Sequence, residues 1–368
     1  MLLAFLVVVL AVSTLFQIIT FVRLGRAFAW SPTFPESDPV PVSVVICARN
    51  EHENLRQLLP MLATQEHPDF EVILVDDRSD DGTEEVVRAF VTVDSRFRYV
   101  RIDRTPDHTN PKKYGLTLGI KAARHEAILL TDADCRPVST QWVASMSRHL
   151  DASVDIVLGL SPYERRAGLL NSFIQYETLL TAFQYAGWAL RGKPYMGVGR
   201  NLCYRKSMFL NNKGFNSHIG ITGGDDDLLV NRLATAANTI LMVHPDSFTQ
   251  SIPKVSWRDF FRQKLRHLAV GKHYQGDDKL RLGFFMLSHL LVWVLGFTLL
   301  FFPETRMVAL SLLGVRGAAL VLCLDPLRKL MAPKIPRAYL IFLDFVYMFY
   351  YLSTGVAALT TKRISWKN

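Results

Sequence analysis

The segment AILLTDADCRP, residues 127–137, ends an apolar run on two aspartates separated by one alanine. Because like charges repel and carboxylates are costly to bury, Asp132 and Asp134 need a partner that offsets their charge. Mg²⁺ or Mn²⁺ fits, since these cations bind one or two protein carboxylates and leave other positions to water and phosphate oxygens. The alternative is a turn in which Asp132 caps a helix and Asp134 is solvated.

Two further acidic segments could take part in the same chemistry. VDDRSDDGT (75–83) could accept hydrogen bonds from a nucleobase or a ribose, or it could be an aspartate-rich turn with Gly82. GGDDDLLVNRL (223–233) sets three carboxylates between a flexible glycine pair and an amphipathic helix. A carboxylate at that position either caps the helix or acts as a general base.

The elements that must position these residues alternate between strand and helix. Apolar runs that stop at polar turns predict strands within 42–51, 70–77, 98–103 and 127–134, with helical spacing between them. This alternation is typical of a parallel sheet in an α/β fold, whose ligands bind beyond the carboxyl ends of the strands. The absence of G-x-G-x-x-G and of a Walker loop after the first strand disfavours a dinucleotide or P-loop site.

Four apolar segments are long enough to cross a bilayer, which takes about 20 residues. Residues 1–22 carry no charge and lack both a basic start and an A-x-A site, so we expect an uncleaved anchor rather than a signal peptide. Segments 283–302, 307–324 and 338–359 predict three more spans. The second is the weakest because Arg316 lies at its middle, and a re-entrant hairpin is the alternative.

Two ionisable residues, Arg316 and Asp344, lie within predicted spans. Such residues face a partner or a cavity, so these two either pair with each other or contact a polar acceptor.

Basic residues near the spans indicate orientation. Arg23 and Arg26 follow the first span, and four basic residues occupy the loop between the last two spans. The positive-inside rule then predicts that residues 24–280 lie in the cytosol. We expect the protein to be an integral protein of the inner (plasma) membrane. The tail at 361–368 would lie outside although it carries three basic residues.

Composition agrees with a membrane protein. The 368 residues include 42 basic and 33 acidic side chains, for a net charge of +9, which suits either nucleic acid or an anionic membrane surface. Four predicted spans decide for the membrane, and we expect no nucleic-acid partner. The four cysteines form no CxxC pair and are expected to be free thiols.

SWRDFFRQKLRHLAVGKHYQ (256–275) interleaves aromatic and basic residues, which predicts a helix in the membrane interface and leaves some cations available for catalysis.

The expected domains are a transmembrane helix at 1–23, a linker at 24–40, a cytosolic catalytic domain at 41–250, an interfacial basic amphipathic region at 251–280, about three transmembrane helices within 281–360, and a tail at 361–368.

Six segments in order resemble the family-2 glycosyltransferases, and in particular their membrane-integrated branch of cellulose, chitin, hyaluronan and poly-N-acetylglucosamine synthases. They are VSVVICARNE, VDDRSDDGT, KKYGLTLGIKAA, LTDADCRP, GGDDDLL and RQKLRH, and they extend from residue 42 to about 270. The resemblance implies a GT-A nucleotide-diphospho-sugar transferase fold, a mostly parallel sheet flanked by helices, in addition to the transmembrane helices.

The resemblance also implies roles for individual residues. The nucleotide-sugar would be bound by Ala48, Glu51, Asp76, Asp77, Lys112, Lys113 and Asp132, with the two lysines near the diphosphate. Asp134, together with Asp132, would bind Mg²⁺ or Mn²⁺.

The base motif of that family reads x-E-D with another acid two positions on. Here Gly224 stands in place of the glutamate, Asp225 is the expected base, Asp227 is the following acid, and Asp226 is a rival base. The Q-x-x-R-W motif departs from the family at its last position, where this chain has histidine. The expected contacts to acceptor or diphosphate are Arg200, Asn201, Asp227, Gln263, Arg266 and His267.

We therefore expect a membrane-bound inverting glycosyltransferase that moves a sugar from a nucleotide-diphosphate sugar, foremost a UDP-sugar, to a lipid-linked or polysaccharide acceptor in envelope glycan or glycolipid synthesis. A processive polysaccharide synthase is the alternative within this class. An alternative of another class is a catalytically inactive membrane scaffold of a glycan-assembly complex.

Overall fold

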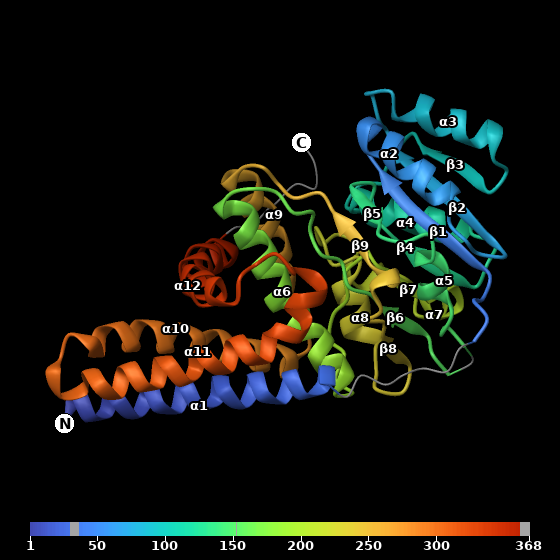
Figure 1. Ribbon diagram of the computed structural model, residues 1–368. Coiled ribbons are helices and arrows are strands. Elements are labelled where there is room, and N and C mark those ends of the chain that lie inside the picture. Colours follow the sequence, from blue (N-terminus) through green and yellow to red (C-terminus); the bar gives the residue numbers. More distant parts are fainter. Residues whose placement is uncertain (30–36, 152, 361–368) are drawn as a thin grey trace. The chain divides into compact units, whose positions relative to one another are not determined.

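The computed structural model describes residues 1–29, 37–151 and 153–360 (Figure 1). Residues 30–36 of the expected linker and the expected tail at 361–368 lie outside the described residues. The chain divides into an α/β unit and a helical unit. The α/β unit contains residues within Pro32–Glu164 and Trp188–Pro253, and the helical unit residues within Met1–Ser31, Arg165–Gly187 and Lys254–Lys362. The expected catalytic domain at 41–250 is thus interrupted by a helical segment that belongs to the other unit.

A seven-stranded sheet forms the centre of the α/β unit, in the order β3-β2-β1-β4-β7-β6-β8. Its strands are β1 Val42–Ala48, β2 Phe70–Asp77, β3 Phe97–Ile102, β4 Ala127–Leu130, β6 Ile156–Leu158, β7 Leu202–Arg205 and β8 Thr239–Leu241. β3, β2, β1 and β4 are parallel, and β7 is antiparallel to its two neighbours. The mostly parallel sheet confirms the predicted α/β fold, and all four predicted strands are present.

Helices and a small second sheet complete the α/β unit. β5 Cys135–Pro137 pairs antiparallel with β9 Thr249–Ser251. The helices are α2 His52–Ala63, α3 Thr83–Val93, α4 Pro111–Ala122, α5 Trp142–Ser147, α7 Lys206–Asn211 and α8 Asp227–Leu233, with 3-10 turns η1 Asn216–His218 and η2 Pro245–Ser247.

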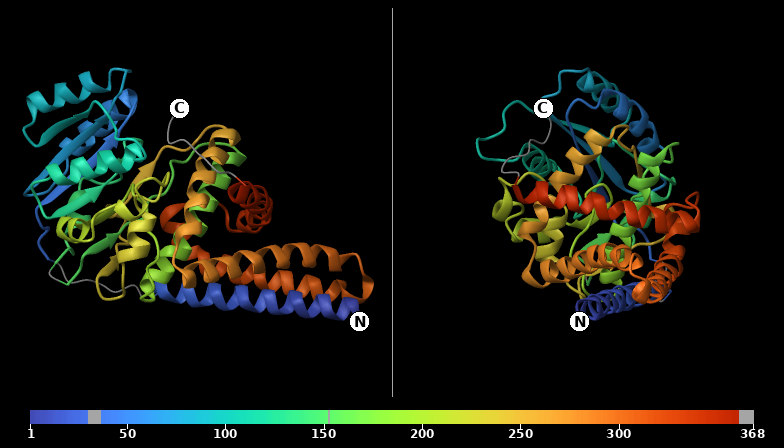
Figure 2. Two further views of the ribbon diagram at one scale, coloured as in Figure 1. Left: turned by 180° about the vertical axis from the view of Figure 1, so that it is seen from behind. Right: turned by 90° about the vertical axis from the view of Figure 1, so that its left-hand side faces the viewer.

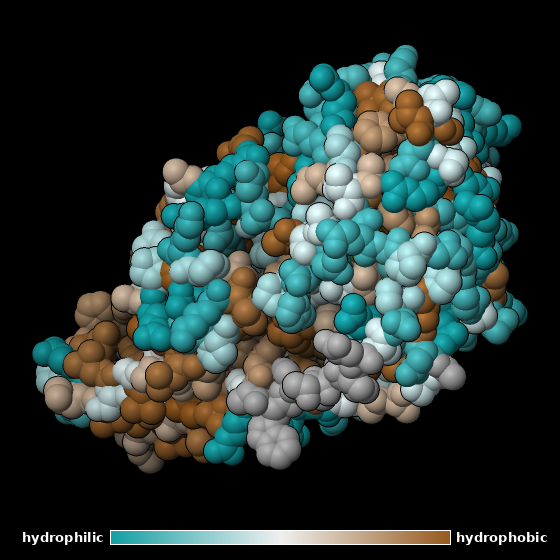
Figure 3. Space-filling model, turned by 45° about the vertical axis from the view of Figure 1, so that its right-hand side comes forward, coloured by the Kyte–Doolittle hydropathy of each residue, from teal (hydrophilic) through white to brown (hydrophobic). Residues whose placement is uncertain are grey.

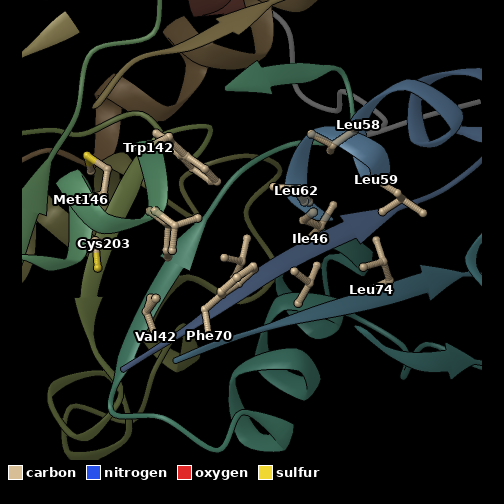
Figure 4. Close-up of a cluster of buried hydrophobic side chains, with 14 of the residues drawn as sticks. Val42, Ile46, Leu58, Leu59, Leu62, Phe70, Leu74, Trp142, Met146 and Cys203 are labelled. Carbon is tan, nitrogen blue, oxygen red and sulfur yellow. The ribbon is translucent and has the colours of Figure 1, made fainter. Parts of the chain in front are cut away.

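The core of this unit lies between α2, α5 and the sheet (Figure 4). Every residue of β1 and β2 is buried, as expected for strands covered on both faces. Helix α2 buries Leu55, Leu58, Leu59 and Leu62, the i, i+3, i+4, i+7 spacing of a single helical face.

Helix α4 approaches β1 very closely, and two glycines make this possible. A Cβ atom on Gly115 would lie 2.5 Å from the Cys47 sulfur, and one on Gly119 would lie 2.5 Å from a Val45 methyl. The close contact fixes α4 over the sheet, which places its first turn beside the carboxyl end of the parallel strands.

Within the part of the chain that the structure describes, the helical unit contains four helices long and apolar enough to cross a membrane. They are α1 Leu2–Ala29, α10 Gly276–Leu300, α11 Pro303–Met331 and α12 Arg337–Thr360. α6 Leu169–Leu190, α9 Trp257–Val270 and the 3-10 turn η3 Gly271–His273 accompany them. α1, α10 and α11 run side by side, whereas α12 runs across them (Figures 1 and 2). α11 continues through Arg316 as one helix, so the re-entrant hairpin is not formed.

Apolar side chains gather on the outer surface of the α1, α10 and α11 bundle, where Figure 3 shows them in brown. They include Phe5, Val8, Val12, Leu15, Ile19, Leu287, Val294, Phe297, Val308, Leu310, Val315 and Leu322. Exposed apolar surface of this extent suits hydrocarbon and would be unfavourable in water.

A buried ionic network lies inside the helical unit. The Arg316 guanidinium of α11 pairs with the Asp344 carboxylate of α12, and both side chains are almost completely buried. Asp344 also accepts hydrogen bonds from the Tyr176 hydroxyl at 2.6 Å and from Trp293 Nε1 at 2.8 Å. Of the two alternatives for these residues, pairing with each other or contact with a polar acceptor, the structure shows the pairing.

The same guanidinium reaches two more helices. Arg316 Nη2 donates to Gln17 Oε1 of α1 at 3.0 Å and contacts His289 Nδ1 of α10 at 3.1 Å. Since arginine only donates, His289 Nδ1 accepts this hydrogen bond. Side chains from five helices, α1, α6, α10, α11 and α12, therefore meet at one pair of opposite charges.

We expect Arg316→Leu to destabilise the full-length protein in detergent by about 3 kcal/mol or more, because Asp344 would stay buried without its counter-ion. The double variant Arg316→Leu/Asp344→Leu should lose less than Arg316→Leu alone. Denaturant unfolding measures both. Arg306→Leu, an exposed arginine of the same helix, is the control. A double variant as unstable as the sum of the two single variants would contradict the pairing.

Candidate functional site

Two aspartates occupy the turn between β4 and β5. β4 ends at Leu130, and the turn is closed by hydrogen bonds from Cys135 N to the Asp132 carbonyl (3.1 Å) and from Ile252 N to the Asp134 carbonyl (3.0 Å). Ligand atoms of Asp132, Asp134 and Cys135 lie within 4.8 Å of one another. The turn brings the two carboxylates together.

The donor set suits a hard divalent cation. Asp132 and Asp134 are only partly buried and offer carboxylate oxygens, the ligands that Mg²⁺ and Mn²⁺ prefer. Cys135 is a poor third ligand for these hard cations, because thiolate is a soft donor. Burial also raises the pKa of its thiol far above the usual value. The residues present therefore fit a metal held by the two carboxylates alone.

The Lys112 ammonium joins two acidic segments that lie far apart in the sequence. Its Nζ lies 3.0 Å from Asp132 Oδ1 and 2.9 Å from Asp225 Oδ2. Burial lowers the pKa of Lys112, but the two carboxylates outweigh burial and raise it well above its usual value. Lys112 is thus a fixed positive charge between the carboxylates.

Asp225 and Asp226 have different surroundings although they are adjacent. Burial raises the pKa of Asp225, but the Lys112 ammonium outweighs burial and the net shift is downward. Burial and the charge of Asp225 raise the pKa of Asp226. Asp226 accepts from Gly199 N at 2.6 Å through Oδ2 and from Asp227 N at 2.8 Å through Oδ1, at the start of α8. Asp225 is ionised beside Lys112, whereas Asp226 is used to cap a helix and hold the Gly199 loop.

The second acidic segment ends β2, next to the end of β1, where Ala48 pairs with Asp76. Asp76 accepts from Ser79 N at 3.0 Å and from the Tyr99 hydroxyl at 2.8 Å, so both its oxygens are engaged. Asp77 is fully buried; its Oδ1 accepts from Arg78 Nε at 2.9 Å, and its Oδ2 has no partner among the described residues. Of the two, Asp77 has an oxygen left for a ligand.

The loops after β1 and β2 are joined by reciprocal hydrogen bonds. Asn50 N donates to Ser79 Oγ (2.9 Å), Asp80 N to Asn50 Oδ1 (3.0 Å), and Glu51 N to Thr83 Oγ1 (2.9 Å). The two loops therefore form one preorganised wall beside Asp77. Neither Ser79 nor Tyr99 was expected from the sequence. The position of Ser79 three residues after Asp76 could have indicated that it contacts this aspartate. Tyr99 lies in a neighbouring strand, so nothing in the local sequence could have indicated its contact with Asp76.

Asn201 is part of the scaffold. Its amide nitrogen donates to the carbonyls of Leu160 (2.7 Å) and Ser247 (2.8 Å), and its Oδ1 accepts from Trp142 Nε1 at 3.0 Å. Both N–H donors are therefore used within the fold. Arg200 Nη2 donates to the Ser161 carbonyl at 3.1 Å, and its guanidinium lies 4.5 Å from the centre of the Tyr163 ring.

The remaining expected contacts lie elsewhere. Asp227 is buried in the first turn of α8, where its Oδ1 accepts from Leu228 N at 2.8 Å. Lys113 does not reach the acidic cluster: its ammonium donates to the backbone carbonyls of His218 (2.6 Å) and Ile221 (2.9 Å). Gln263, Arg266 and His267 lie on α9 of the helical unit.

Comparisons with known proteins agree with these features. Residues 43–209 match the family model of glycosyl transferase family 2, and residues 127–356 match that of glycosyl transferase family group 2. Glycosyltransferase AglE of Haloferax volcanii is 31% identical over 122 residues, which are 32% of this chain and 38% of AglE. The poly-beta-1,6-N-acetyl-D-glucosamine synthase of Staphylococcus epidermidis is 29% identical over 93 residues, 25% of this chain and 21% of the synthase. The alignments thus span well under half of either curated relative.

A solved structure shares the fold. The mannosyltransferase PcManGT from Pyrobaculum calidifontis, in complex with GDP-Man and Mn²⁺, is 18% identical and has a TM-score of 0.63. The match covers 98% of this chain and 100% of that chain. At this identity the likeness concerns the fold alone, and it confirms the expected GT-A fold.

We expect Asp226→Ala to lower the melting temperature of the full-length protein by about 2–4 °C, because the change removes a helix cap worth about 1 kcal/mol. Asp107→Ala, in an exposed loop of the same unit, is the control and should leave the melting temperature unchanged. Equal melting temperatures for Asp226→Ala and wild type would show that Asp226 does not hold α8 and the Gly199 loop.

Proposed function

The chain belongs to the family-2 glycosyltransferases, and from this premise we propose that it is a membrane-bound inverting enzyme that transfers a sugar from a UDP-sugar to a lipid-linked or glycan acceptor. The observation that carries the proposal is the position of Lys112 between Asp132 and Asp225. One cation thereby connects the carboxylate proposed for the donor diphosphate with the carboxylate proposed for the acceptor hydroxyl.

The mechanism follows from where charge develops. Attack of an acceptor hydroxyl on the anomeric carbon breaks the bond to the nucleoside diphosphate, and negative charge grows on the leaving oxygen. The Lys112 ammonium would stabilise that charge. Asp132 and Asp134 would hold Mg²⁺ or Mn²⁺, which when bound supplies further positive charge to the diphosphate. Asp225, held as the carboxylate beside the Lys112 ammonium, would accept the proton of the hydroxyl in a single displacement.

The donor base is proposed from the hydrogen-bonding capacity of Asp77. Its Oδ1 already accepts from Arg78, whereas its Oδ2 is a buried acceptor without a partner among the described residues. One acceptor matches the single ring N–H of uracil, whereas the adjacent ring N–H and amino group of guanine would use both oxygens of a carboxylate. This supports a UDP-sugar. The GDP-sugar class, to which the ligand of the mannosyltransferase belongs, is the alternative to be tested.

The acceptor is proposed to be lipid-linked or a glycan at the membrane surface. Arg200, Asp227, Gln263, Arg266 and His267 stay proposed contacts to acceptor or diphosphate, while Asn201 would act through the scaffold. We also propose that the α/β unit faces the cytosol at the inner (plasma) membrane, because the loop between α11 and α12 and the end of α1 carry basic residues.

Incubation of full-length protein in membranes with a panel of UDP- and GDP-sugars should release UDP in the presence of Mn²⁺ or Mg²⁺, and EDTA should abolish the release. The mass of the glycolipid formed distinguishes a single addition from a polymer. Release of GDP alone would refute the inference from Asp77. No release with any donor would favour the inactive scaffold, and a long polymer would favour the processive synthase.

Asp225→Asn should lower kcat by at least about 100-fold, the usual scale for loss of a general base, while the KM for the nucleotide-sugar changes little. Asp226→Asn, the matched control at the neighbouring position, should lose much less, because it retains one acceptor oxygen for the cap. Full turnover by Asp225→Asn together with loss in Asp226→Asn would reverse the assignment of the base.

A further inference from the structure

Lys113 is fully buried, yet among the described residues no carboxylate forms an ion pair with it. Its ammonium donates to the carbonyl oxygens of His218 and Ile221, 2.6 and 2.9 Å away. A lysine is rarely buried without a partner, so these two carbonyl dipoles stand in for a counter-ion. Burial lowers the pKa of Lys113 to about 8, which leaves the ammonium predominantly charged at neutral pH.

The carbonyls belong to the loop that leads to Asp225. The N-cap residue of α4 binds the same loop, since Asn110 N donates to the Ile219 carbonyl at 2.9 Å. Within the loop, Ile221 N donates to the His218 carbonyl at 3.1 Å. The first turn of α4 thus holds three backbone carbonyls between residues 218 and 221.

Thr222 and two glycines separate this anchored segment from Asp225. Gly223 and Gly224 have φ values of +82° and +76°, a left-handed conformation that side chains other than glycine rarely adopt. On the far side, Asp226 caps α8 and binds Gly199 N. Asp225 therefore lies on a short flexible link between two fixed points, one made by Lys113 and the other by Asp226.

We propose that Lys113 is a positioning residue, which anchors the loop 216–224 and so places the Asp225 carboxylate in the site without contacting the donor. Its neighbour Lys112 contacts Asp225 directly. A donor diphosphate near Lys112 competes with Asp225 for that ammonium, because both are anionic. The bonds from Lys113 to backbone carbonyls do not depend on that competition, so Asp225 keeps its place when the donor is bound. The kinetic part of this inference rests on the proposed function.

Hydrogen exchange of the full-length protein in detergent tests the anchor without any substrate. In Lys113→Met, amides of the peptide that covers residues 216–224 should exchange at least about tenfold faster than in wild type, because local opening controls their rate. Lys121→Met, the control at an exposed lysine of the same helix, should change exchange there less than about twofold. Equal exchange in wild type and Lys113→Met, or equal increases in both variants, would overturn the proposal.

Kinetics test the consequence. Lys113→Met should lower kcat by about 10- to 100-fold, the range expected when a catalytic group is misplaced, and leave the KM for the nucleotide-sugar within about twofold. Lys112→Met should raise that KM. A raised KM in Lys113→Met with unchanged exchange would make Lys113 a donor-binding residue and refute the proposal.

The two measurements separate this inference from the proposed function. If no nucleotide-sugar is turned over by wild type, the function fails while hydrogen exchange still decides the role of Lys113. If Lys113→Met does not fold, Lys113→Gln serves in its place, since a neutral amide fits the same space and retains a donor. In Lys113→Gln the amides of residues 216–224 should then exchange faster than in wild type but more slowly than in a fully released loop. An exchange rate equal to that of wild type would refute the proposal.

Discussion

The acidic site depends on how one ammonium satisfies two carboxylates from distant parts of the chain. Asp132 and Asp225 would repel each other at the carboxyl edge of the sheet, and Lys112 contacts both at hydrogen-bonding distance. The position of Lys112 in turn depends on α4, which two glycines allow to pack directly on β1. A packing constraint beneath the sheet edge therefore sets the electrostatics above it, and the same helix turn holds the loop before Asp225.

The helical unit also contains a buried pair of opposite charges. Arg316 and Asp344 are both buried, and each also has neutral hydrogen-bonding partners, although Arg316 Nε has none among the described residues. In each unit a buried charge is tolerated because an opposite charge and several dipoles surround it. The difference lies in exposure: the network of the helical unit is closed, whereas Asp132 and Lys112 keep partial access to solvent, which a reactive site requires.

Much of the fold could be predicted from local patterns. Buried β-branched runs end at Ala48, Asp77 and Leu130, close to the expected positions, because burial on both faces requires continuous apolar sequence. The pair Asp132 and Asp134 could be found for the same reason, since charges that end such a run stand out. Helix α6 was not predicted. The roles of Asn201 and Lys113 could not be predicted either, because their hydrogen-bond partners are backbone carbonyls 41 to 108 positions away in the sequence.

By itself, the sequence determined the alternating α/β pattern, the three acidic segments at its strand and loop ends, and the apolar helices. These are properties of composition and spacing over short windows. Only the tertiary structure decided that Lys112 rather than Lys113 joins the carboxylates, that Asp77 rather than Asp76 keeps an open oxygen, and that α12 runs across the other apolar helices. Adjacent residues of one type are equivalent in a pattern, and they differ only when the fold gives each a different neighbour.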